Sequence, residues 1–354
     1  MLEKRSVTFV ESIDLVKERY VRDPIYGMIY LPKLAWKIID TPLFQRSRRI
    51  KQLGCVEYVY PTATHSRFSH MIGTAHLAKK VCEQLNITNK EKMTVILAGL
   101  LHDIGHAPMS HIYEQAGGSH HEQRSCLFID LLCNEILELK EYSIDIKNII
   151  RGSSEKEFMA EIISNSKTGL DVDKLDYLVR DCYFTGVKCI INVDRIIDGI
   201  SLKNNSIVYN KKIIEDITDV FRTRYTLHQR VYQHRVVRTI SLMICEIFKL
   251  NTFNPETIDE WINFTDDWFT QLRNNTEKTK QLFNQIETRN LWKTEIINFT
   301  GKSTINFIFE NWPIDIYTIT GGCKGEIPLG NRTSINIKEN VQNDKIIYLK
   351  YTKN

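Results

Sequence analysis

Apolar residues recur at helical spacing along much of this chain, and alternate with polar ones only in a few short stretches. Residues 20–31 (YVRDPIYGMIYL) alternate around a Pro and a Gly, which predicts a short strand or hairpin. LPKLAWKIIDTPLFQRSRRIKQL then begins a helical part, in which Pro32 suits a first turn and Thr41-Pro42 a second helix start. From about residue 300, the runs TINFIFE, IDIYTIT and KIIYLKYT predict a small sheet. We therefore expect a mainly α chain, with a helical core over 1–295 and a small α+β C-terminal lobe over 296–354.

The stretch 93–111, MTVILAGLLHDIGHAPMSH, is an apolar run that ends abruptly in charged and imidazole side chains. Its first nine residues suit a buried helix, and a Gly and a Pro shortly afterwards indicate that the helix stops and turns there. His102 and Asp103 place a nitrogen and an oxygen ligand side by side at this end. Such a pair is costly to desolvate, and metal coordination is one common way to offset that cost.

Two further segments predict helices that begin with histidines. YVYPTATHSRFSHMIGTAHLAKKV is a loop entering a helix, with Arg67 and His70 three residues apart on one face. A lone His in a helix is more often structural than a ligand, so His70 becomes a candidate metal ligand only if a second ligand lies near it. AGGSHHEQRSCLFIDLLCNEIL runs from a glycine loop into an amphipathic helix, with His121 in the first turn and His120 expected to be exposed.

Two helical stretches carry polar residues at intervals of four. In GLDVDKLDYLVRDC, this spacing places Asp173, Tyr177 and Asp181 along one stripe. Residues 215–250 predict one long helix, in which Arg224, His228 and Tyr232 share a face. Arg, His and Tyr together suit the phosphates and base of a nucleotide, although a long basic helix at a subunit contact has the same pattern.

Composition describes an ordinary soluble protein, with 25% charged and 42% hydrophobic residues and a formal net charge of only +4. Eight of the ten histidines precede residue 122, which points to a site in the first third. The eight cysteines show no paired zinc-ligand spacing, so we expect reduced thiols and a cytoplasmic protein, with a nuclear location still open. The charged N-terminus does not predict a signal peptide, and no apolar run is long enough to predict a membrane span.

The order His70, His102-Asp103, Asp173 resembles the HD-domain phosphohydrolase superfamily, whose helical fold gathers four such ligands around a metal. The match widens to the blocks DPIYG, IIDTPLFQRSRRIKQLG, HSRFSH, AGLLHDIGHAPMSH, HEQ, GLDVDKLDYLVRDC, FRTRYTLHQRVYQH and QIETRNLWK. Over residues 19–293 these are similar to the sterile-alpha-motif and HD-domain deoxynucleoside triphosphate triphosphohydrolases. We expect no sterile-alpha-motif domain here, and a C-terminal lobe shorter than in that family.

The resemblance implies a metal-dependent hydrolysis at the α-phosphorus, giving a deoxynucleoside and inorganic triphosphate. His70, His102, Asp103 and Asp173 match the metal ligands, which suit Fe, Mn, Ni or Zn, with Mg possible at a neighbouring position. His111 matches the residue that protonates the departing 5′-oxygen, and His106 and His121 match its partners. Glu114 stands where the family has Asp, so a carboxylate remains with a reach one methylene longer.

The resemblance also implies a nucleotide pocket. Arg67, Lys174 and Arg224 match the groups that hold the triphosphate, whereas the sugar pocket is matched by Gln52, Leu53, Tyr177 and Asp181. The tyrosine ring packs against C2′ there, which would exclude a ribose hydroxyl. The nucleotide is lined further by His228, Tyr232 and Gln233.

Activation by GTP or dGTP is implied by two further groups of residues. The guanine-nucleotide site is matched by Asp40, Gln45 and Arg48, with Arg19 and Lys293 at the phosphates. A second activator site is matched by Tyr60, Arg195, Lys212, Arg230, His234, Arg235 and Arg289. Asn210 and Asp216 replace an Arg and an Asn of that pattern, which should weaken triphosphate binding. Since the family's activator sites lie between subunits, we expect a homo-oligomer, a dimer that becomes a tetramer.

Two alternatives stay open at this point. One is an HD phosphodiesterase or nuclease, for which nucleic acid would be a substrate; the triphosphohydrolase itself does not require nucleic acid. The other is a catalytically silent protein that binds nucleotides or assembles with a related enzyme. The basic cluster Arg46, Arg48, Arg49 and Lys51 is likewise either a solvated helix face or a phosphate or purine site.

Overall fold

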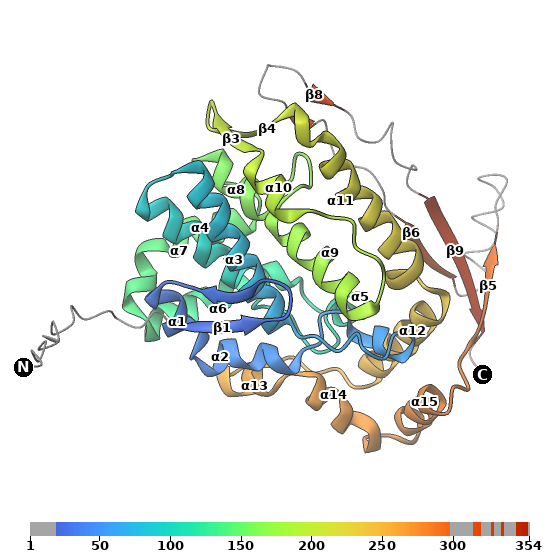
Figure 1. Cartoon of the computed structure of the whole chain (residues 1–354). Coiled ribbons are helices and arrows are strands. Elements are labelled where there is room, and N and C mark those ends of the chain that lie inside the picture. Colours follow the sequence, from blue (N-terminus) through green and yellow to red (C-terminus); the bar gives the residue numbers. More distant parts are fainter. Residues whose placement is uncertain (1–18, 298–313, 320–326, 329–333, 336–344, 353–354) are drawn as a thin grey trace, which may run out of the picture.

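The computed structural model describes residues 19–297, 314–319, 327–328, 334–335 and 345–352 (Figure 1). Helices form the body of the molecule, and the described strands form three two-stranded sheets and one three-stranded sheet. The prediction of a mainly α fold is therefore confirmed.

The helices up to the middle of the chain are α1 (Lys33–Ile39), α2 (Pro42–Gln45), α3 (Arg67–Leu85), α4 (Asn89–Leu101), α5 (His111–Gln115), α6 (His121–Glu135), α7 (Lys140–Ile150) and α8 (Glu157–Ile163). The later ones are α9 (Val172–Thr185), α10 (Val193–Asp198), α11 (Ile214–Leu227), α12 (Arg235–Leu250), α13 (Ile258–Asn263), α14 (Asp266–Gln271) and α15 (Glu277–Glu287). Thr41 caps α2 with Pro42 at its first position, as the sequence predicts.

The predicted hairpin at 20–31 is confirmed, because β1 (Tyr20–Asp23) pairs antiparallel with β2 (Gly27–Tyr30). A second hairpin joins β3 (Ile200–Lys203) to β4 (Ser206–Tyr209), and β7 (Ile327–Pro328) pairs with β8 (Ser334–Ile335).

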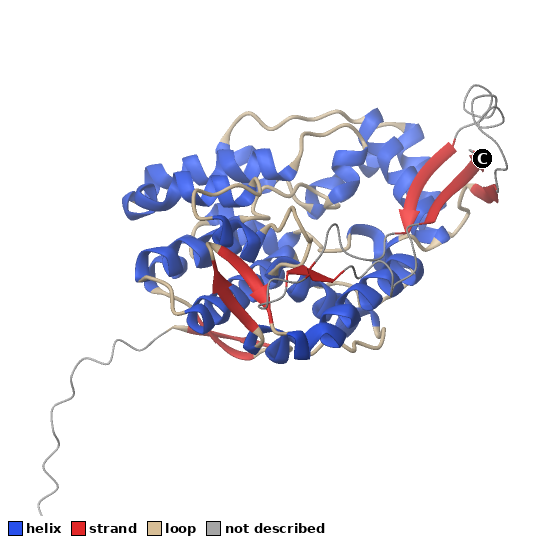
Figure 2. Ribbon diagram, turned by 90° about the horizontal axis from the view of Figure 1, so that it is seen from above, coloured by secondary structure: helices blue, strands red, loops and turns tan. Residues whose placement is uncertain are grey.

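The predicted C-terminal sheet is present in part, beside the helical body (Figure 2). Its central strand β9 (Lys345–Thr352) pairs with β6 (Ile314–Ile319) and with β5 (Lys293–Ile297). These strands contain the runs IDIYTIT, except its last residue, and KIIYLKYT, whereas TINFIFE lies outside the described residues. The division into a core and a lobe at residue 295 stays a prediction, and β5 spans that boundary.

The core is built on the close packing of α3 against α4, which positions two of the predicted metal ligands. Gly99 of α4 faces α3, and a Cβ atom at this position would lie 3.3 Å from Thr74 O and 3.4 Å from Ala75 Cα. The small residue thus lets the two backbones approach closely. As a result, the start of α3 and the end of α4 lie side by side, with His70 and His102 facing each other.

The prediction of one long helix over 215–250 is wrong. α11 ends at Leu227, a π-helical turn spans His228–Tyr232, and a new helix, α12, begins at Arg235. His234 is extended (ψ 130°), and its ring nitrogen accepts from the amide of Val236 as the cap of α12. No Pro or Gly marks this break in the sequence. Tertiary contacts hold the turn instead, because Tyr60 donates its hydroxyl to the carbonyl of Arg230.

The basic cluster after α2 separates into a buried and an exposed part. Arg46 is 1% exposed and donates to the carbonyls of His106 (2.6 and 2.9 Å) and Trp261 (3.1 Å), and burial lowers its pKa to about 9. Arg48 and Arg49 are exposed. Arg46 is therefore a structural residue that joins α2 to the segment after α4.

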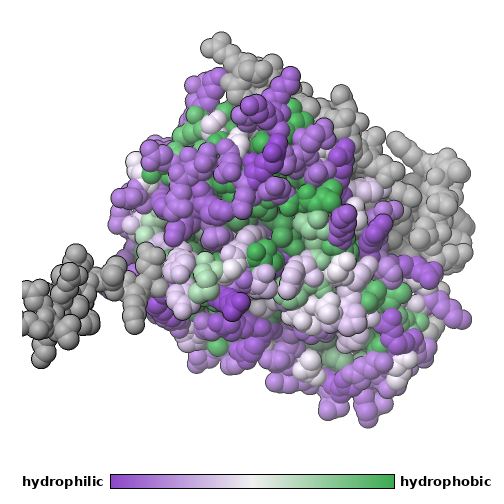
Figure 3. Space-filling view, viewed as in Figure 1, coloured by the Kyte–Doolittle hydropathy of each residue, from purple (hydrophilic) through white to green (hydrophobic). Residues whose placement is uncertain are grey.

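The surface of the described residues is mostly hydrophilic in the view of Figure 3, with apolar side chains gathered near the middle of that face, where α9 and α11 lie in Figure 1. Seven cysteines belong to the described part of the chain, and six of them are buried. A search of the described residues finds no helix with the length and apolar character of a membrane span.

Candidate metal-centred active site

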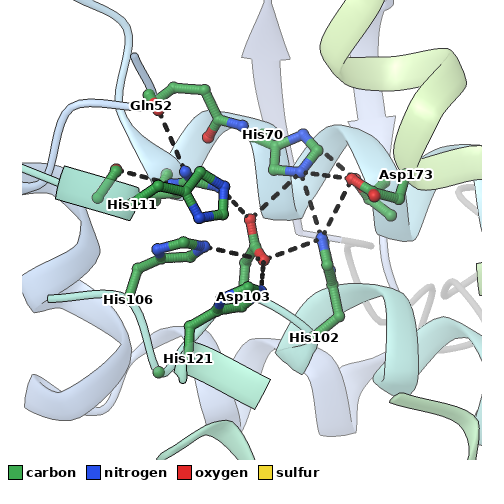
Figure 4. Close-up of polar contacts among 12 residues, drawn as sticks. Gln52, His70, His102, Asp103, His106, His111, His121 and Asp173 are labelled. Atoms are coloured by element: carbon green, nitrogen blue, oxygen red, sulfur yellow. Dashed lines mark hydrogen bonds and ion pairs between the residues drawn. The ribbon is translucent and has the colours of Figure 1, made fainter. Parts of the chain in front are cut away.

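Three predicted metal ligands converge from three helices. His70 from α3, His102 from the end of α4 and Asp173 from the first turn of α9 point toward one another (Figure 4). The distance from His70 Nε2 to His102 Nε2 is 3.2 Å, and the distances from Asp173 Oδ1 to these nitrogens are 3.1 and 3.5 Å. Both imidazoles are buried. Three of the four predicted ligands, which are far apart in the sequence, are thus in contact in the structure.

The hydrogen bonds on the far side of each ring show that these residues fit a metal ion. His102 Nδ1 lies 2.8 Å from the carbonyl oxygen of Gly99, and His70 Nδ1 lies 2.7 Å from Asp176 Oδ2. Both acceptors fix the proton on Nδ1, so the two Nε2 lone pairs face each other at 3.2 Å. Two facing lone pairs repel unless a cation lies between them. Although burial lowers the pKa of His70, hydrogen bonds with Asp173 and Asp176 raise it to about 10, so in the absence of a metal the ring carries a second proton on Nε2, and a bound cation would take the place of that proton.

Asp103 lies between this group and the remaining histidines (Figure 4). Its Oδ2 is 3.5 Å from His70 Nε2 and 2.5 Å from Arg67 Nη1, and its Oδ1 is 3.6 Å from His102 Nε2. Burial raises its pKa, but the charges of His102 and Arg67 outweigh burial and lower it well below the usual range. Asp103 is therefore an ionised carboxylate held by an arginine at the edge of the metal position.

The four residues predicted to act as catalytic groups form a second cluster. The rings of His106 and His121 stack at 4.1 Å, and His111 meets both edge-on. Glu114 joins the cluster through Oε1, 2.8 Å from His121 Nδ1, and Oε2, 3.6 Å from His111 Nδ1. The longer side chain of Glu114 thus reaches both histidines. His120 is exposed, as predicted, with 74% of its side chain accessible.

The surroundings lower the pKa of both Glu114 and His111, so they favour an ionised carboxylate and a neutral imidazole. Burial raises the pKa of Glu114, but hydrogen bonds with His111 and His121 lower it well below its ordinary value. Desolvation within the cavity lowers the pKa of His111, Glu114 raises it, and the charges of Arg67 and His121 lower it, so the net shift is downward. The side chain of His111 nevertheless opens into the cavity, where 58% of it is exposed.

A strained segment delivers His111 to this position. Met109 and Ser110 both have positive φ, 58° and 54°, which non-glycine residues rarely adopt. Asp266 of α14 accepts from the amide of Met109 (2.7 Å) and from that of Lys51 (2.9 Å). The hydroxyl of Ser110 donates to the carbonyl of Lys51 at 2.6 Å. These contacts hold the strained backbone in place.

A cavity of about 420 Å³ opens onto both clusters. The predicted residues that line it are Gln52, Leu53, Arg67, Asp103, His111, His121, Asp173, Tyr177, Asp181, His228, Tyr232 and Gln233. His70, His102, His106 and Glu114 stand behind this wall. A cavity of this size suits a nucleotide-sized ligand.

One side of the cavity is held by a carboxylate between two aromatic residues. Asp181 Oδ2 accepts from the hydroxyl of Tyr232 at 2.6 Å, and its Oδ1 lies 2.7 Å from His65 Nε2. His65 is buried and stacks on Phe184 at 4.6 Å. Tyr177 lies one helical turn before Asp181 on α9, as the four-residue period predicts.

Lys174 and Arg224 lie beside the cavity wall. Lys174 Nζ is 6.0 Å from the centre of the Tyr177 ring and 3.6 Å from Asp171 Oδ1. Burial lowers the pKa of Lys174, but the charges of Asp171, Tyr177 and Asp173 raise it above its ordinary value. Arg224 Nε is buried and has no hydrogen-bond partner among the residues that the structure describes.

Comparison with known proteins assigns this arrangement to a family. The pattern of the HD domain matches residues 67–184, and that of the HD-associated region matches residues 191–309. The first match includes all four predicted metal ligands. The chain belongs to the HD-domain family.

Named relatives support a narrower resemblance within the HD-domain family. The chain is 35% identical over 317 residues to the deoxynucleoside triphosphate triphosphohydrolase SAMHD1 homolog of Dictyostelium discoideum, covering 80% of this chain and 62% of the relative. Its identity to SAMHD1 of Homo sapiens is 32%, over 78% of this chain and 54% of the relative. Identity to the putative HD domain-containing protein L394 of Acanthamoeba polyphaga mimivirus is 37%, over 71% and 62%. The resemblance stated from the sequence is confirmed, although the chain spans only 54–62% of the length of these relatives.

A solved structure shares the HD-domain fold almost end to end. It is a hypothetical protein from Aquifex aeolicus, 28% identical, with a TM-score of 0.82 over 95% of this chain and 96% of the other.

The residues predicted to bind an activator do not line the cavity of this HD-domain protein. Arg19 pairs with Asp40 through two hydrogen bonds, one of 3.0 Å, and Arg48 Nε donates to Gln45 Oε1 at 2.7 Å. Lys293 lies apart from these four in the chain, at the start of β5, where it is exposed.

The second predicted activator group lies around α10, α11 and the π-helical turn. Arg195 Nε donates to Asp216 at 2.8 Å, and its Nη2 lies 3.4 Å from the carbonyl of Lys212. Asp216, one of the two departures from the family pattern, thus forms an ion pair with Arg195, one of the residues predicted to bind the activator. Arg230 and Arg235 are exposed, and Arg289 donates to the carbonyl of Tyr58 at 3.0 Å.

Several residues that shape the site were not predicted as site residues. Asp176, Arg180 and Asp23 support His70 from behind, His65 holds Asp181, and Asp266 holds Met109. The cavity wall also includes Val56, Met109, Ser110, Ile112, Gln115, Val237, Arg238 and Ser241. Asp176 and Arg180 have the i, i+4 spacing of a surface ion pair, so their sequence signal is ordinary.

Proposed function

We propose that this protein hydrolyses deoxynucleoside triphosphates to a deoxynucleoside and inorganic triphosphate. The observation that carries the proposal is the position of His111, which opens into one cavity with the metal-side carboxylates Asp103 and Asp173 and with Tyr177. The names of the curated relatives support the substrate class. A divalent metal held by the predicted ligands would supply Lewis acidity and an acidified water; Fe, Mn, Zn and Ni suit the imidazole-rich position, and Mg a neighbouring one.

The chain's own residues bind the triphosphate and move one proton. Arg67, Lys174 and Arg224 bring positive charge to the triphosphate. Water attacks the α-phosphorus, the bond from phosphorus to the 5′-oxygen breaks, and His111 protonates the departing oxygen. Glu114 orients the ring of His111, and the negative charge of bound triphosphate favours the protonated imidazole.

Tyr177 is proposed to exclude ribonucleotides, because its ring would occupy the space of a 2′-hydroxyl. In a Tyr177→Ala variant, the ratio of kcat/KM for dATP over ATP is expected to fall by about 10- to 200-fold. Steady-state kinetics with both nucleotides measure this ratio. Tyr183→Ala is the matched control, since Tyr183 lies on the same helix but is exposed. Equal losses for dATP and ATP in Tyr177→Ala would assign the ring to binding alone.

Activation by GTP or dGTP, with assembly from dimer to tetramer, is the finer part of the proposal. Its support is chemical: Arg19 is bonded to Asp40, and Arg48 is bonded to Gln45, so a nucleotide would replace these two polar contacts. The pairing of Arg195 with Asp216 argues that the second activator site is weakened. Light scattering with and without GTP and dATP tests assembly, and an unchanged mass would contradict it.

Product analysis tests the function directly. The protein is incubated with Mg²⁺ and Mn²⁺ and each deoxynucleoside triphosphate, with and without GTP, and the products are separated by ion exchange. We expect a deoxynucleoside and intact triphosphate, and more of both with GTP. Release of pyrophosphate from the deoxynucleoside triphosphates would favour a phosphodiesterase. Release of mononucleotides from added single-stranded nucleic acid would favour a nuclease. Binding without any product would favour a silent nucleotide-binding or assembly protein.

A further inference from the structure

A chain of buried charged residues runs from the back of His70 to the N-terminal hairpin. Asp176 Oδ2, 2.7 Å from His70 Nδ1, also accepts from Arg180 Nε at 2.9 Å. Arg180 Nη2 bonds to Asp176 Oδ1 at 2.9 Å, so the guanidinium grips this carboxylate with two parallel bonds. The third nitrogen, Nη1, donates to Asp23 Oδ2 at 2.8 Å.

The hairpin end of this chain is fixed by its own backbone. Asp23 closes β1, and its Oδ1 accepts from the amides of Ile25 (2.8 Å) and Tyr26 (3.1 Å) in the turn before β2. One oxygen of Asp23 therefore shapes the turn, while the other holds Arg180. If the hairpin shifts, Arg180 loses a partner, and the position of Asp176 changes with it.

Burial and local packing show that this arrangement is specific. Asp176 and Arg180 are both 0% exposed, and Asp23 is 6% exposed. Gly73 of α3 leaves room for them, because a Cβ atom there would lie 1.9 Å from Asp176 Oδ1 and 2.3 Å from Arg180 Nη2. An alanine would be favoured at this helical position on propensity alone. The glycine thus serves the charged group behind His70.

The charge balance of the group points to a role beyond holding the fold. Two carboxylates surround a single guanidinium, which leaves one negative charge in excess, and Asp176 presents this charge to the ring nitrogen of His70. A carboxylate behind a histidine fixes its tautomer and strengthens the opposite nitrogen as a ligand.

We propose that Asp176, Arg180 and Asp23 are positioning residues that fix the ring of His70 for metal binding and couple metal affinity to the seating of the β1–β2 hairpin. The proposal rests on the metal site of the proposed function and not on its substrate. Asp176 acts directly on His70. Arg180 and Asp23 act through Asp176, so their effects on the metal depend on it.

The test measures affinity for Zn²⁺, by competition with a chromophoric chelator, in the whole 354-residue chain without nucleotide. Asp176→Asn is expected to weaken Zn²⁺ binding by about 10- to 100-fold. Asp23→Asn is expected to weaken it in the same direction by less. Glu161→Gln is the matched control, since Glu161 is a buried carboxylate that accepts from the amide of Ile207 at 2.7 Å and from the side chains of Lys167 and Ser206, none of which is a predicted metal ligand. Its thermal unfolding should shift while its Zn²⁺ affinity stays that of the wild type.

A double-mutant cycle separates coupling from a general loss of stability. In the Asp176→Asn background, Asp23→Asn should have no further effect on Zn²⁺ affinity, because the chain is already interrupted. Additive effects, or an Asp176→Asn variant that binds Zn²⁺ as the wild type does, would overturn the proposal. If Asp176→Asn does not fold, Asp23→Asn decides alone, and unchanged Zn²⁺ affinity in it overturns the coupling to the hairpin.

Linkage provides a second readout that does not depend on catalysis. If hairpin seating favours the metal, Zn²⁺ must favour hairpin seating by the same free energy. Zn²⁺ should therefore slow hydrogen exchange at the amides of Ile25 and Tyr26 in the wild type, and not in Arg180→Lys. If the Zn²⁺ affinities follow these expectations but the protein has no triphosphohydrolase activity, the proposed function is refuted and this inference still holds.

Discussion

Replacing His111 by alanine is expected to lower kcat for dATP hydrolysis by about 10²- to 10⁴-fold, the usual contribution of a positioned proton donor. His111 opens into the cavity, and its Nδ1 is oriented by Glu114. Without its imidazole, the 5′-oxygen must leave as an alkoxide or take a proton from water. Single-turnover kinetics measure the chemical step, and elemental analysis should give unchanged metal content, because His111 is outside the predicted ligand set.

His120→Ala is the control for this experiment. Its Nδ1 is also near Glu114 Oε2, at 3.7 Å, but its side chain is 74% exposed. Activity close to that of the wild type is expected. If His120→Ala and His111→Ala lost activity equally, the effect would belong to the environment of Glu114. If His111→Ala kept full activity, another group would have to be the proton donor.

Replacing His102 by alanine is expected to remove the metal and, with it, detectable hydrolysis. His102 supplies one of two facing Nε2 atoms, and its Nδ1 is fixed by the carbonyl of Gly99. Loss of a direct ligand should weaken metal binding by more than the roughly 100-fold upper end for an outer residue. Elemental analysis of the purified variant, together with dATP turnover in added Mn²⁺, measures both effects.

His102 is a better target than Asp103 for this purpose. Removing the Asp103 carboxylate would leave Arg67 buried without its ion pair, at a cost of about 3–5 kcal/mol of stability, so metal loss and unfolding would be confused. His120→Ala serves as the control here as well, because its side chain is 74% exposed and it is not one of the predicted ligands. Wild-type metal content in His102→Ala would remove the basis of the mechanism.

The local sequence predicts the helices that carry the ligands better than it predicts what stands behind them. The apolar run at 93–101 and the four-residue period of Asp173 and Tyr177 are properties of single segments, and both segments are helical in the structure. The contact between Asp23 and Arg180 joins residues 157 positions apart. No local pattern encodes such a contact, so the support of His70 could be found only in three dimensions.

The break between α11 and α12 shows the same limit in the backbone. Residues 215–250 have helical spacing throughout, and local propensity favours continuing the helix. The π-helical turn at His228–Tyr232 is held by contacts with distant side chains, among them the hydroxyl of Tyr232 on Asp181. This turn also determines where His228 and Tyr232 line the cavity. Part of the geometry of the site therefore depends on a π-helical turn that local propensity does not predict.

The hydrogen bond from the amide of Met109 to Asp266 affects the order in which parts of the site are completed during synthesis of the chain. The predicted metal ligands all lie within the first 173 residues, whereas the carboxylate that fixes the strained approach to His111 is at position 266. A nascent chain whose synthesis has passed α9 contains all four predicted ligands, but it still lacks the acceptor for the backbone amide of Met109. The backbone approach to His111, and with it the proton transfer that we propose for this residue, is therefore complete only after α14 has been made.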